Sequence, residues 1–547
     1  MSVALKRPEG LIKCAARLHA PSRAQASSPL RRQQLRTAVT LPELNKDRDE
    51  SGRKRVVILG SGWAGYTIAR RLDPRKFQVV IVSPRSYFVF TPLLASTSVG
   101  TLEFRTALEP VRSRRNKFDF FQGWADDVSF KDKTISIEEA VADPRQSLAL
   151  TAGDAQEVKN EQEEKKEDIE KTRKGKLFEM KYDKLIVAVG CYSQTFGTPG
   201  VKENALFLKD VGDARRIRNR LLTCFETAAL PTTTPEMRKC LLNFAIVGGG
   251  PTGIEFSAEL HDIITEDLAR IYPQLMPYYN VTVYDVAPTV LSMFDEKLSK
   301  YAISTLSREG VHIRTSHHVE SLRRGPPEQY KDQMKDGLSC WTLKLKEEGE
   351  IGVGMVVWST GLMMNPFVQK ALDGVQQMPV EGITWGRSKI GAGNERWKVM
   401  KNEKTGGVVT DDKLRVLLHP EGGSGEKVER AVMEDVFAVG DCAQTLDTLY
   451  PATAQVASQK GEWLAKHLND DDIATTKGFH WKNMGVMAYL GNWNAILSSE
   501  QGNISGRVAW FIWRGAYLTK AVSWRNKLLI PMYWAINWLF GRDISRF

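Results

Sequence analysis

The chain of 547 residues lacks several features that would each define its class. No segment has the roughly 20 consecutive apolar residues that a membrane-spanning helix needs. The nearest, Leu528 to Phe540, is short and is interrupted by Pro531 and Asn537. The six cysteines form no C-x-x-C pair and the eight histidines show no ligand spacing, so we expect no metal site and a reducing compartment. Basic residues are not interleaved with aromatics as in a nucleic-acid motif, so we expect no nucleic-acid partner.

Acidic residues are scarce in the first 45 positions, where only Glu9 and Glu43 occur among many arginines and serines. An Arg-rich, Ser-containing and acid-poor segment without a long apolar core is typical of a mitochondrial presequence rather than a secretory signal. We therefore leave residues 1–45 out of the fold. The net charge of the whole chain is +11, which makes an anionic surface a plausible neighbour.

Two glycine-rich loops are the strongest signal that is present. Each follows an apolar strand pattern, precedes a helical pattern and has the spacing G-x-G-x-x-G: Gly60, Gly62 and Gly65, then Gly248, Gly250 and Gly253. In such loops the first glycine permits a tight turn, the second lets the backbone approach a pyrophosphate, and the third lets helix pack on strand. The sequence therefore predicts an α/β protein with two Rossmann-like dinucleotide-binding units.

The strand and helix patterns divide the chain further. We predict a first part of the first unit at 46–240 with a charged insertion at 142–176, the second unit at 241–370, a second part of the first unit at 371–476, and a C-terminal membrane-anchoring region at 477–547. The strand that ends at Gly440-Asp441 is expected to return to the first unit. The helix after it is expected to begin at Pro451, since proline favours the first helical turn.

The residue that ends the second strand of each unit indicates the nucleotide. Asp285 in the second unit would accept hydrogen bonds from a ribose 2′-hydroxyl and repel a 2′-phosphate, which favours NADH. The first unit has Ser83 at this position, a weaker ribose ligand, so its assignment to FAD depends on Gly440 and on the carboxylate of Asp441. Three further residues are assigned to the same sites: Thr91 and Gly190 to FAD, and Gly361 to NADH.

The lack of cysteines after the first glycine loop restricts which molecule can accept electrons from the flavin. No cysteine occurs between Gly65 and Cys191, so the C-x4-C pair of disulfide-reducing flavoenzymes is missing and the acceptor needs no thiol relay. Gln455 and Gln459 share one face of a predicted helix. Their amides suit the flavin pyrimidine edge or a quinone carbonyl, or they are simply solvated. Glu255, in the first turn after the second loop, has a role near nicotinamide or quinone, or is merely favoured by the helix dipole.

Aromatic and basic residues dominate the end of the chain, where Asp543 is the one acid from Arg507 onward. The aromatics between Arg507 and Arg546 are Trp510, Phe511, Trp513, Tyr517, Trp524, Tyr533, Trp534, Trp538 and Phe540. Aromatics and cations at helical spacing suit a helix that lies in a membrane interface. A dimerisation helix or a domain core remains the alternative, and we also expect a homodimer.

Four motifs together carry a family resemblance: Tyr87-Phe88-Val89-Phe90-Thr91-Pro92-Leu93-Leu94, Gly248-Gly249-Gly250-Pro251-Thr252-Gly253-Ile254-Glu255-Phe256, Ala454-Gln455-Val456-Ala457-Ser458-Gln459 and Gly541-Arg542-Asp543. From about Arg53 to Phe547, the charged insertion excepted, the chain resembles the fungal type of mitochondrial alternative (type II) NADH:ubiquinone oxidoreductase. The resemblance implies FAD in the first unit, NADH in the second, ubiquinone beside the glutamine helix, and a C-terminus on the inner mitochondrial membrane. It implies a single-subunit enzyme that pumps no protons, with Glu255, Gln455 and Gln459 as its catalytic candidates.

Two other functions stay open at the level of sequence. A sulfide:quinone oxidoreductase would need a pair of redox cysteines, for which Cys191 and Cys442 are available. A flavoprotein similar to apoptosis-inducing factor would act in signalling, although the aromatic-basic tail and the glutamine pair count against it.

Overall fold

The computed structural model describes residues 40–546 except 115, 144–146, 152–174, 332–339, 374–375, 378–382, 386–387, 390–395 and 422–429. Most of the predicted presequence and of the charged insertion lies outside the described residues. Helix α1 (Leu41–Ser51) nevertheless begins inside the segment that we had left out of the fold. The Glu43 carboxylate accepts from the Thr40 backbone N–H at 2.8 Å, a capping-box contact, and Leu44 is buried, so the ordered fold begins before residue 46.

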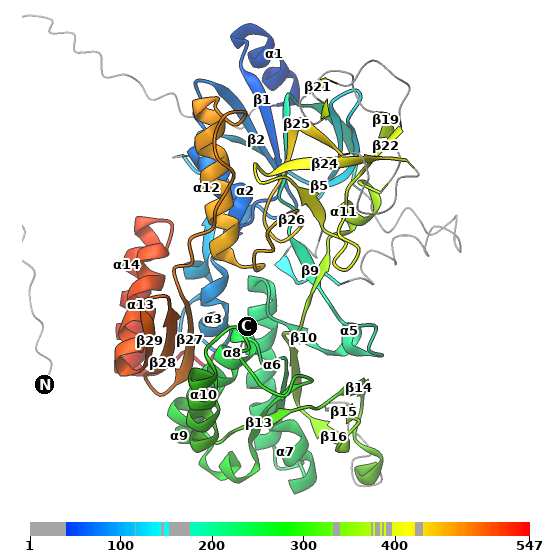
Figure 1. Cartoon of the computed structure of the whole chain (residues 1–547). Coiled ribbons are helices and arrows are strands. Elements are labelled where there is room, and N and C mark those ends of the chain that lie inside the picture. The colour runs from blue at the N-terminus through cyan, green and yellow to red at the C-terminus, as the bar shows by residue number, and fades with distance from the viewer. Residues whose placement is uncertain are drawn as a thin grey trace, which may run out of the picture. The chain divides into compact units, whose positions relative to one another are not determined.

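Five parallel strands form the centre of the first sheet, in the order β25 (Ala431–Ala438), β8 (Lys184–Val187), β1 (Lys54–Leu59), β2 (Phe77–Ser83) and β5 (Asp119–Ser129). Antiparallel strands extend it beyond both ends, through β6 (Thr134–Glu139) and β7 (Leu177–Lys181) on one side and β24 (Arg415–Pro420) and β22 (Arg396–Val399) on the other. β25 comes late in the chain yet pairs with β8, and Figure 1 shows β25 in the same part of the molecule as β1 and β2. Gly440 and Asp441 therefore follow a strand of the same sheet as the first glycine loop.

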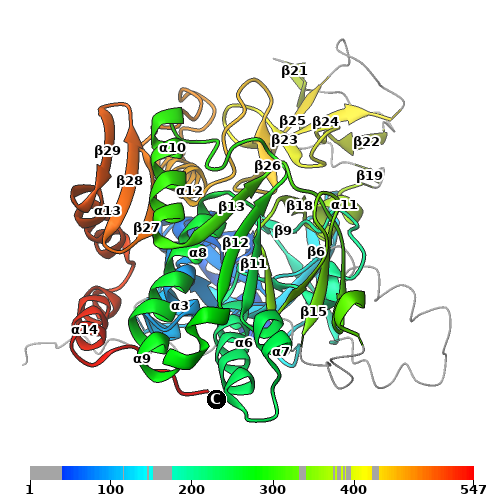
Figure 2. The same ribbon diagram turned by 90° about the horizontal axis from the view of Figure 1, so that it is seen from below.

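The second sheet is also parallel, in the order β10 (Leu206–Phe207), β17 (Met355–Trp358), β11 (Asn243–Val247), β12 (Asn280–Asp285) and β13 (Val311–Thr315). Figure 2 shows β11, β12 and β13 side by side. Three antiparallel strands, β14 (Val319–Arg324), β15 (Trp341–Leu345) and β16 (Gly349–Val353), form a separate small sheet. The predicted α/β fold with two Rossmann-like units is confirmed.

Each glycine loop leads into a helix: α2 (Trp63–Arg71) after β1 and α8 (Pro251–Ile263) after β11. α2 packs against α12 (Ala454–Asp470), and a Cβ at Gly461 of α12 would lie 2.9 Å from the backbone oxygen of Ala64. α12 begins at Ala454 rather than at Pro451, because the Thr453 hydroxyl accepts from the Val456 N–H and caps the helix there. The predicted start was therefore three residues early.

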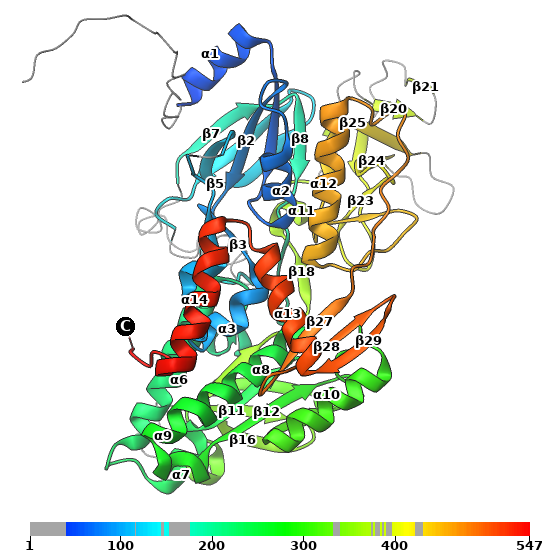
Figure 3. The ribbon, with the colours of Figure 1, turned by 90° about the vertical axis from the view of Figure 1, so that its left-hand side faces the viewer.

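The C-terminal region is a three-stranded antiparallel sheet, β27 (Val486–Gly491), β28 (Asn494–Ser499) and β29 (Gly502–Gly506), followed by α13 (Arg507–Lys520) and α14 (Trp524–Phe540). β27 packs against α8, and α13 packs against β28 (Figure 3). Trp510 and Trp513 belong to the same buried cluster as α8 and the second sheet. The region thus continues the core instead of forming a detachable anchor. Within the described residues, no helix is long and apolar enough to cross a bilayer.

Candidate functional site

A cleft opens beside the first glycine loop. Seven of the eight residues assigned to FAD from the sequence line it: Gly60, Gly62, Ser83, Thr91, Gly190, Gly440 and Asp441. No protein atom lies within 4 Å of a Cβ added at Gly62, so the loop backbone faces open space where a pyrophosphate would fit. The eighth residue, Gly65, lies behind the loop, where an added Cβ would be 2.1 Å from the Gly60 oxygen. Its role is the close contact of helix and strand.

Hydroxyl groups take the place of the usual acid in this cleft. The Ser61 and Ser83 hydroxyl oxygens are 3.0 Å apart, and Ser83 is buried at the end of β2. The Trp63 indole N–H donates to the Thr91 hydroxyl at 3.1 Å. The strand end of the first unit is therefore neutral, which suits a ligand bound by hydrogen bonds without a fixed carboxylate.

Two lysines that the sequence motifs did not indicate, the buried Lys460 and the partly buried Lys209, lie near Asp441. Burial lowers the pKa of Lys460 to about 8 and also lowers the pKa of Lys209. Burial raises the pKa of Asp441, and the two ammonium groups act in the opposite direction. Lys460 follows the buried positions Val456 and Ala457 at helical spacing, a pattern that predicts an inward side chain.

A second cavity of about 550 Å³ adjoins the cleft, and the two share Gly440 and Asp441 in their linings. Its other wall comes from β9 (Cys191–Ser193) and β18 (Leu362–Met364), which pair with each other in the segments that connect the two units. Lys460 and Thr453 of the α12 region complete the lining. A ligand of the second unit that reached this cavity would meet a ligand of the first at Asp441.

The second glycine loop repeats the geometry of the first. A Cβ at Gly250 would meet no protein atom within 4 Å, whereas a Cβ at Gly253 would lie 2.0 Å from the Gly248 oxygen. The middle glycine is thus open to a ligand and the third is required for packing. Gly361 has a φ of +52°, in the left-handed region, and an added Cβ would lie 3.0 Å from the Phe196 ring. Gly361 therefore lies in the connection between the units in a backbone conformation that favours glycine.

The Asp285 carboxylate is attached to this loop. It accepts hydrogen bonds from the backbone N–H groups of Gly249 and of Ala287, the latter at 2.7 Å. A carboxylate at the end of β12 and in contact with the glycine loop is correctly located for a ribose 2′-hydroxyl.

Glu255 lies in the first turns of α8, where the C-terminal region covers it. Its carboxylate accepts from the Tyr489 backbone N–H at 3.1 Å, the Trp513 indole N–H at 3.2 Å and the Tyr517 hydroxyl at 3.5 Å. Burial raises its pKa to about 8. The Tyr517 ring in turn contacts Phe90, beside the first glycine loop. Glu255 is therefore a buried acid between the two units that holds its proton at neutral pH.

The structure does not bring the amides of Gln455 and Gln459 into the cleft lining. Gln455 accepts from the Trp481 indole at 2.9 Å and the Met484 N–H at 3.1 Å, and Gln459 exchanges two hydrogen bonds with the Lys482 backbone. The residues of α12 that line the cleft are small: Ala454 and Ala457. The four-residue spacing predicted a common face but could not indicate which neighbour that face meets. Both amides hold segment 481–484 against α12.

The two cysteines available for a thiol mechanism are buried. Burial raises the pKa of Cys191 to about 12 and that of Cys442 to about 11. Their thiols donate to backbone carbonyls, Cys191 to Asp441 at 3.0 Å and Cys442 to Val439 at 3.3 Å. Thiolate is the reactive form, so neither side chain is prepared for sulfide chemistry.

Comparison with known proteins agrees with this geometry. A family model described as pyridine nucleotide-disulphide oxidoreductase matches residues 54–386, and one described as NDH2 C-terminal domain matches 483–543. The chain is 34% identical to a probable NADH dehydrogenase of Dictyostelium discoideum, over 90% of this chain and 91% of that one. It is 33% identical to an internal alternative NAD(P)H-ubiquinone oxidoreductase A1 of Arabidopsis thaliana, over 91% and 86%.

Among solved structures, NDH2 from Plasmodium falciparum in complex with NADH has the same fold, with a TM-score of 0.69 at 21% identity over 90% of this chain and all of that one. With two matched domain models and relatives aligned along nearly their whole length, the chain belongs to the pyridine nucleotide-disulphide oxidoreductase family and, within it, to the alternative NAD(P)H-ubiquinone oxidoreductases (NDH2).

Proposed function

We propose that this protein transfers a hydride from NADH to FAD and then two electrons to ubiquinone, without pumping protons. The observation that carries the proposal is the pair of nucleotide-binding units in one fold: the first glycine loop opens on the cleft lined by Gly440 and Asp441, and the second loop donates to the Asp285 carboxylate. FAD, when bound, accepts two electrons as hydride and passes them to the quinone. The Arabidopsis relative is named for NAD(P)H and ubiquinone and the Dictyostelium relative for NADH, and Asp285 favours NADH over NADPH in this chain.

The assignment of residues follows the contacts. Gly60, Gly62, Ser83, Thr91, Gly190, Gly440 and Asp441 hold FAD, while Gly248, Gly250, Asp285 and Gly361 hold NADH. Gly65 and Gly253 pack the two helices. Glu255 holds a proton close to the path of the electrons. Gln455 and Gln459 form the quinone side of α12 by holding segment 481–484, a modification of the direct amide contact expected from the sequence.

Separate half-reactions test the function. The purified full chain, with its flavin identified, should be reduced by NADH and reoxidised by a short-chain ubiquinone, and sulfide should not replace NADH. Gln455→Ala and Gln459→Ala should slow reoxidation by quinone more than reduction by NADH, since each lost hydrogen bond costs about 1–3 kcal/mol if its partner stays buried. Lys466→Ala, an exposed position of α12, is the matched control. Equal slowing of both half-reactions would show that Gln455 and Gln459 only support the structure.

We also propose that the enzyme is of the fungal type, that it is a peripheral, monotopic protein of the inner mitochondrial membrane, and that it forms a homodimer. The support for membrane contact is an apolar surface on α13 and α14, where ten large apolar residues are exposed: Val508, Phe511, Ile512, Trp524, Leu528, Met532, Ile536, Trp538, Leu539 and Phe540. Arg507, Lys520 and Arg525 flank it and suit anionic lipid. The same surface is available to a second copy.

Substitution tests this better than deletion, because Trp510 and Trp513 belong to the core. Phe511→Ser, Trp538→Ser and Phe540→Ser, combined in one chain, should abolish flotation with anionic vesicles and leave the flavin bound. Leu230→Ser, at a residue 51% exposed outside this surface, is the control. A variant that still floats would refute the membrane surface. A variant that no longer floats and that also changes from dimer to monomer in detergent would show that the surface serves both membrane contact and dimer formation.

A further inference from the structure

A cavity of about 760 Å³ lies between the C-terminal helices and the end of α8, which continues as the π-helical segment η4 (Ile264–Leu268). Five tryptophans line it: Trp493, Trp510, Trp513, Trp534 and Trp538. Among the described residues, it shares no lining residue with the two cavities of the cofactor site. Its volume is in the range of small-molecule sites.

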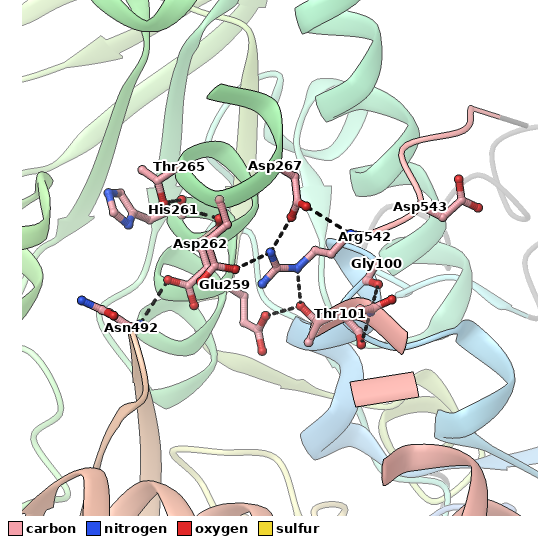
Figure 4. A network of polar contacts seen from close by, with 12 residues as sticks. Gly100, Thr101, Glu259, His261, Asp262, Thr265, Asp267, Asn492, Arg542 and Asp543 are labelled. Atoms are coloured by element: carbon pink, nitrogen blue, oxygen red, sulfur yellow. Dashed lines mark hydrogen bonds and ion pairs between the residues drawn. The ribbon is translucent and has the colours of Figure 1, made fainter. Parts of the chain in front are cut away.

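The buried acid of this cavity already has partners. Glu259 of α8, 3% exposed, accepts hydrogen bonds from the hydroxyls of Ser96 at 2.6 Å and Thr101 at 2.7 Å. Figure 4 shows Glu259 directed at Thr101. Two charge-assisted hydrogen bonds satisfy this carboxylate without a ligand.

One of the cations is also fully engaged. The Arg542 guanidinium donates to Asp267 at 2.6 Å, to Glu266 at 2.7 Å and to the Thr101 hydroxyl at 3.0 Å. Figure 4 shows Arg542 between Asp267 and Thr101. The three acids of the lining, Glu259, Glu266 and Asp267, therefore all have partners within the protein.

Arg514, unlike Arg542, contacts aromatic rings and no acceptor within the described residues. Its guanidinium carbon lies 4.2 Å from the centres of both the Trp510 and the Trp534 rings. Its Nε is buried without a hydrogen-bond partner, and within the described part of the chain Arg514 forms no hydrogen bond or ion pair. Burial lowers its pKa, while the charge of Glu259 acts in the opposite direction. Arg514 therefore lines the cavity as a cation that needs an acceptor.

We propose that this cavity binds the phosphate group of a membrane phospholipid, with the Arg514 guanidinium as donor and the acyl chains directed over Trp538, Leu539 and Phe540. A guanidinium between aromatic rings presents its planar edge, which matches phosphate geometry. The three apolar residues are 72%, 62% and 83% exposed at the same end of α14. Tryptophan is enriched at the headgroup level of bilayers. Arg270, exposed on the lining, adds a second positive charge.

The charge decides between ligands. A water molecule or a neutral quinone carbonyl can accept from Arg514, but neither brings a negative charge to the guanidinium, which forms no ion pair within the described residues. A phosphate diester supplies both the acceptor oxygens and the negative charge.

Titration of the tryptophan fluorescence tests the proposal, since two tryptophans contact Arg514. The flavin-loaded full chain in mild detergent is titrated with short-chain phosphatidylglycerol, with the matching diacylglycerol, with inorganic phosphate and with short-chain ubiquinone. Saturable binding of phosphatidylglycerol, at least about tenfold tighter than binding of the other three, is the expected result. Equal binding of the diacylglycerol or of ubiquinone, or a complete response to inorganic phosphate, would overturn the lipid assignment.

Variants identify the donor. Arg514→Gln should weaken phosphatidylglycerol binding at least about tenfold, and Arg270→Gln should weaken it by a smaller factor. Arg308→Gln, exposed in α10 (Glu296–Glu309) outside the cavity lining, should leave it unchanged. Flavin content and circular dichroism verify folding. If Arg514→Gln does not fold, Arg514→Lys keeps the charge without the planar edge and should bind with intermediate affinity. Unchanged binding in whichever Arg514 variant folds would refute the site, whatever the outcome of the electron-transfer assays.

Discussion

The helices that follow the two glycine loops begin alike and are covered differently. α2 packs against another helix, α12, and at the second residue past its third glycine it has Thr67, which lies 3.3 Å from a Cβ added at Gly461. α8 has Glu255 at the matching position, beneath β27 and α13. The loop spacing therefore fixes how a pyrophosphate is approached. The neighbour that covers the helix determines whether the same turn can hold a proton.

The strand ends of the two units differ as well. The first ends in a pair of hydroxyls, Ser61 and Ser83, and the second in the Asp285 carboxylate. A carboxylate discriminates between nucleotides by repelling a 2′-phosphate, whereas hydroxyls do not. Cofactor choice should therefore depend strongly on the second strand end and weakly on the first.

The largest effect should come from the middle glycines. Gly62→Ala and Gly250→Ala both leave the protein folded, because neither Cβ meets a protein atom within 4 Å. Gly62→Ala should lose FAD and with it all activity. Gly250→Ala should keep FAD but bind NADH at least about tenfold more weakly, since a methyl group occupies the pyrophosphate space. Flavin content and NADH titration separate the two. Flavin loss in both variants would show that the units are not independent.

Glu255→Gln should slow reoxidation by quinone about a hundredfold, the range of a lost general acid, with flavin reduction by NADH little changed. The pKa of Glu255 is about 8, so the wild-type quinone step should be constant below that pH and decline above it. The variant should show no such decline. Thr67→Val, the matching position of α2, is the control and should leave both half-reactions unchanged.

Stability gives an independent check of Glu255. Its pKa is raised from 4.5 in the unfolded chain to about 8 in the folded one, so the folded state binds the extra proton between these values. The free energy of unfolding should therefore fall as pH rises from about 4.5 to 8, and Glu255→Gln should remove that part of the decline. Melting temperatures across this range measure it. An identical pH dependence in the variant would show that Glu255 is not buried as an acid.

Asp285→Asn should raise the ratio of kcat/KM for NADPH over NADH about tenfold, because the repulsion of a 2′-phosphate disappears. The asparagine oxygen can still accept from the Ala287 N–H, so the loop should remain in place. Steady-state kinetics with both nucleotides measure the ratio. An unchanged ratio would show that Asp285 does not contact the ribose of the nucleotide.

The smallest effect should come from Ser83→Ala. It removes one hydroxyl of the pair at 3.0 Å and should weaken FAD binding by about threefold, equivalent to one neutral hydrogen bond. The nucleotide preference should not change. A large loss of flavin would show that the first unit depends on this position as strongly as the second depends on Asp285.

The sequence was sufficient for the architecture because glycine spacing and apolar strand patterns are local. The loops, both sheets and the return of β25 to the first sheet follow from such patterns. The hydrogen-bond partners of long polar side chains cannot be predicted from such local patterns. Gln455 binds segment 481–484, and Lys460 is buried beside Asp441. The covering of Glu255 by residues more than 230 positions later was likewise invisible in the sequence.

The order of synthesis gives this last contact a consequence. Both glycine loops, and every strand of the two parallel sheets, precede residue 446, so a nascent chain can complete its nucleotide-binding units before β27 and α13 exist. Glu255 then remains uncovered until the final 60 or so residues emerge and Arg542 engages Asp267. A chain that stops before β27 would therefore expose Glu255 to solvent beside complete nucleotide-binding units, and β27 and α13 close this part of the enzyme.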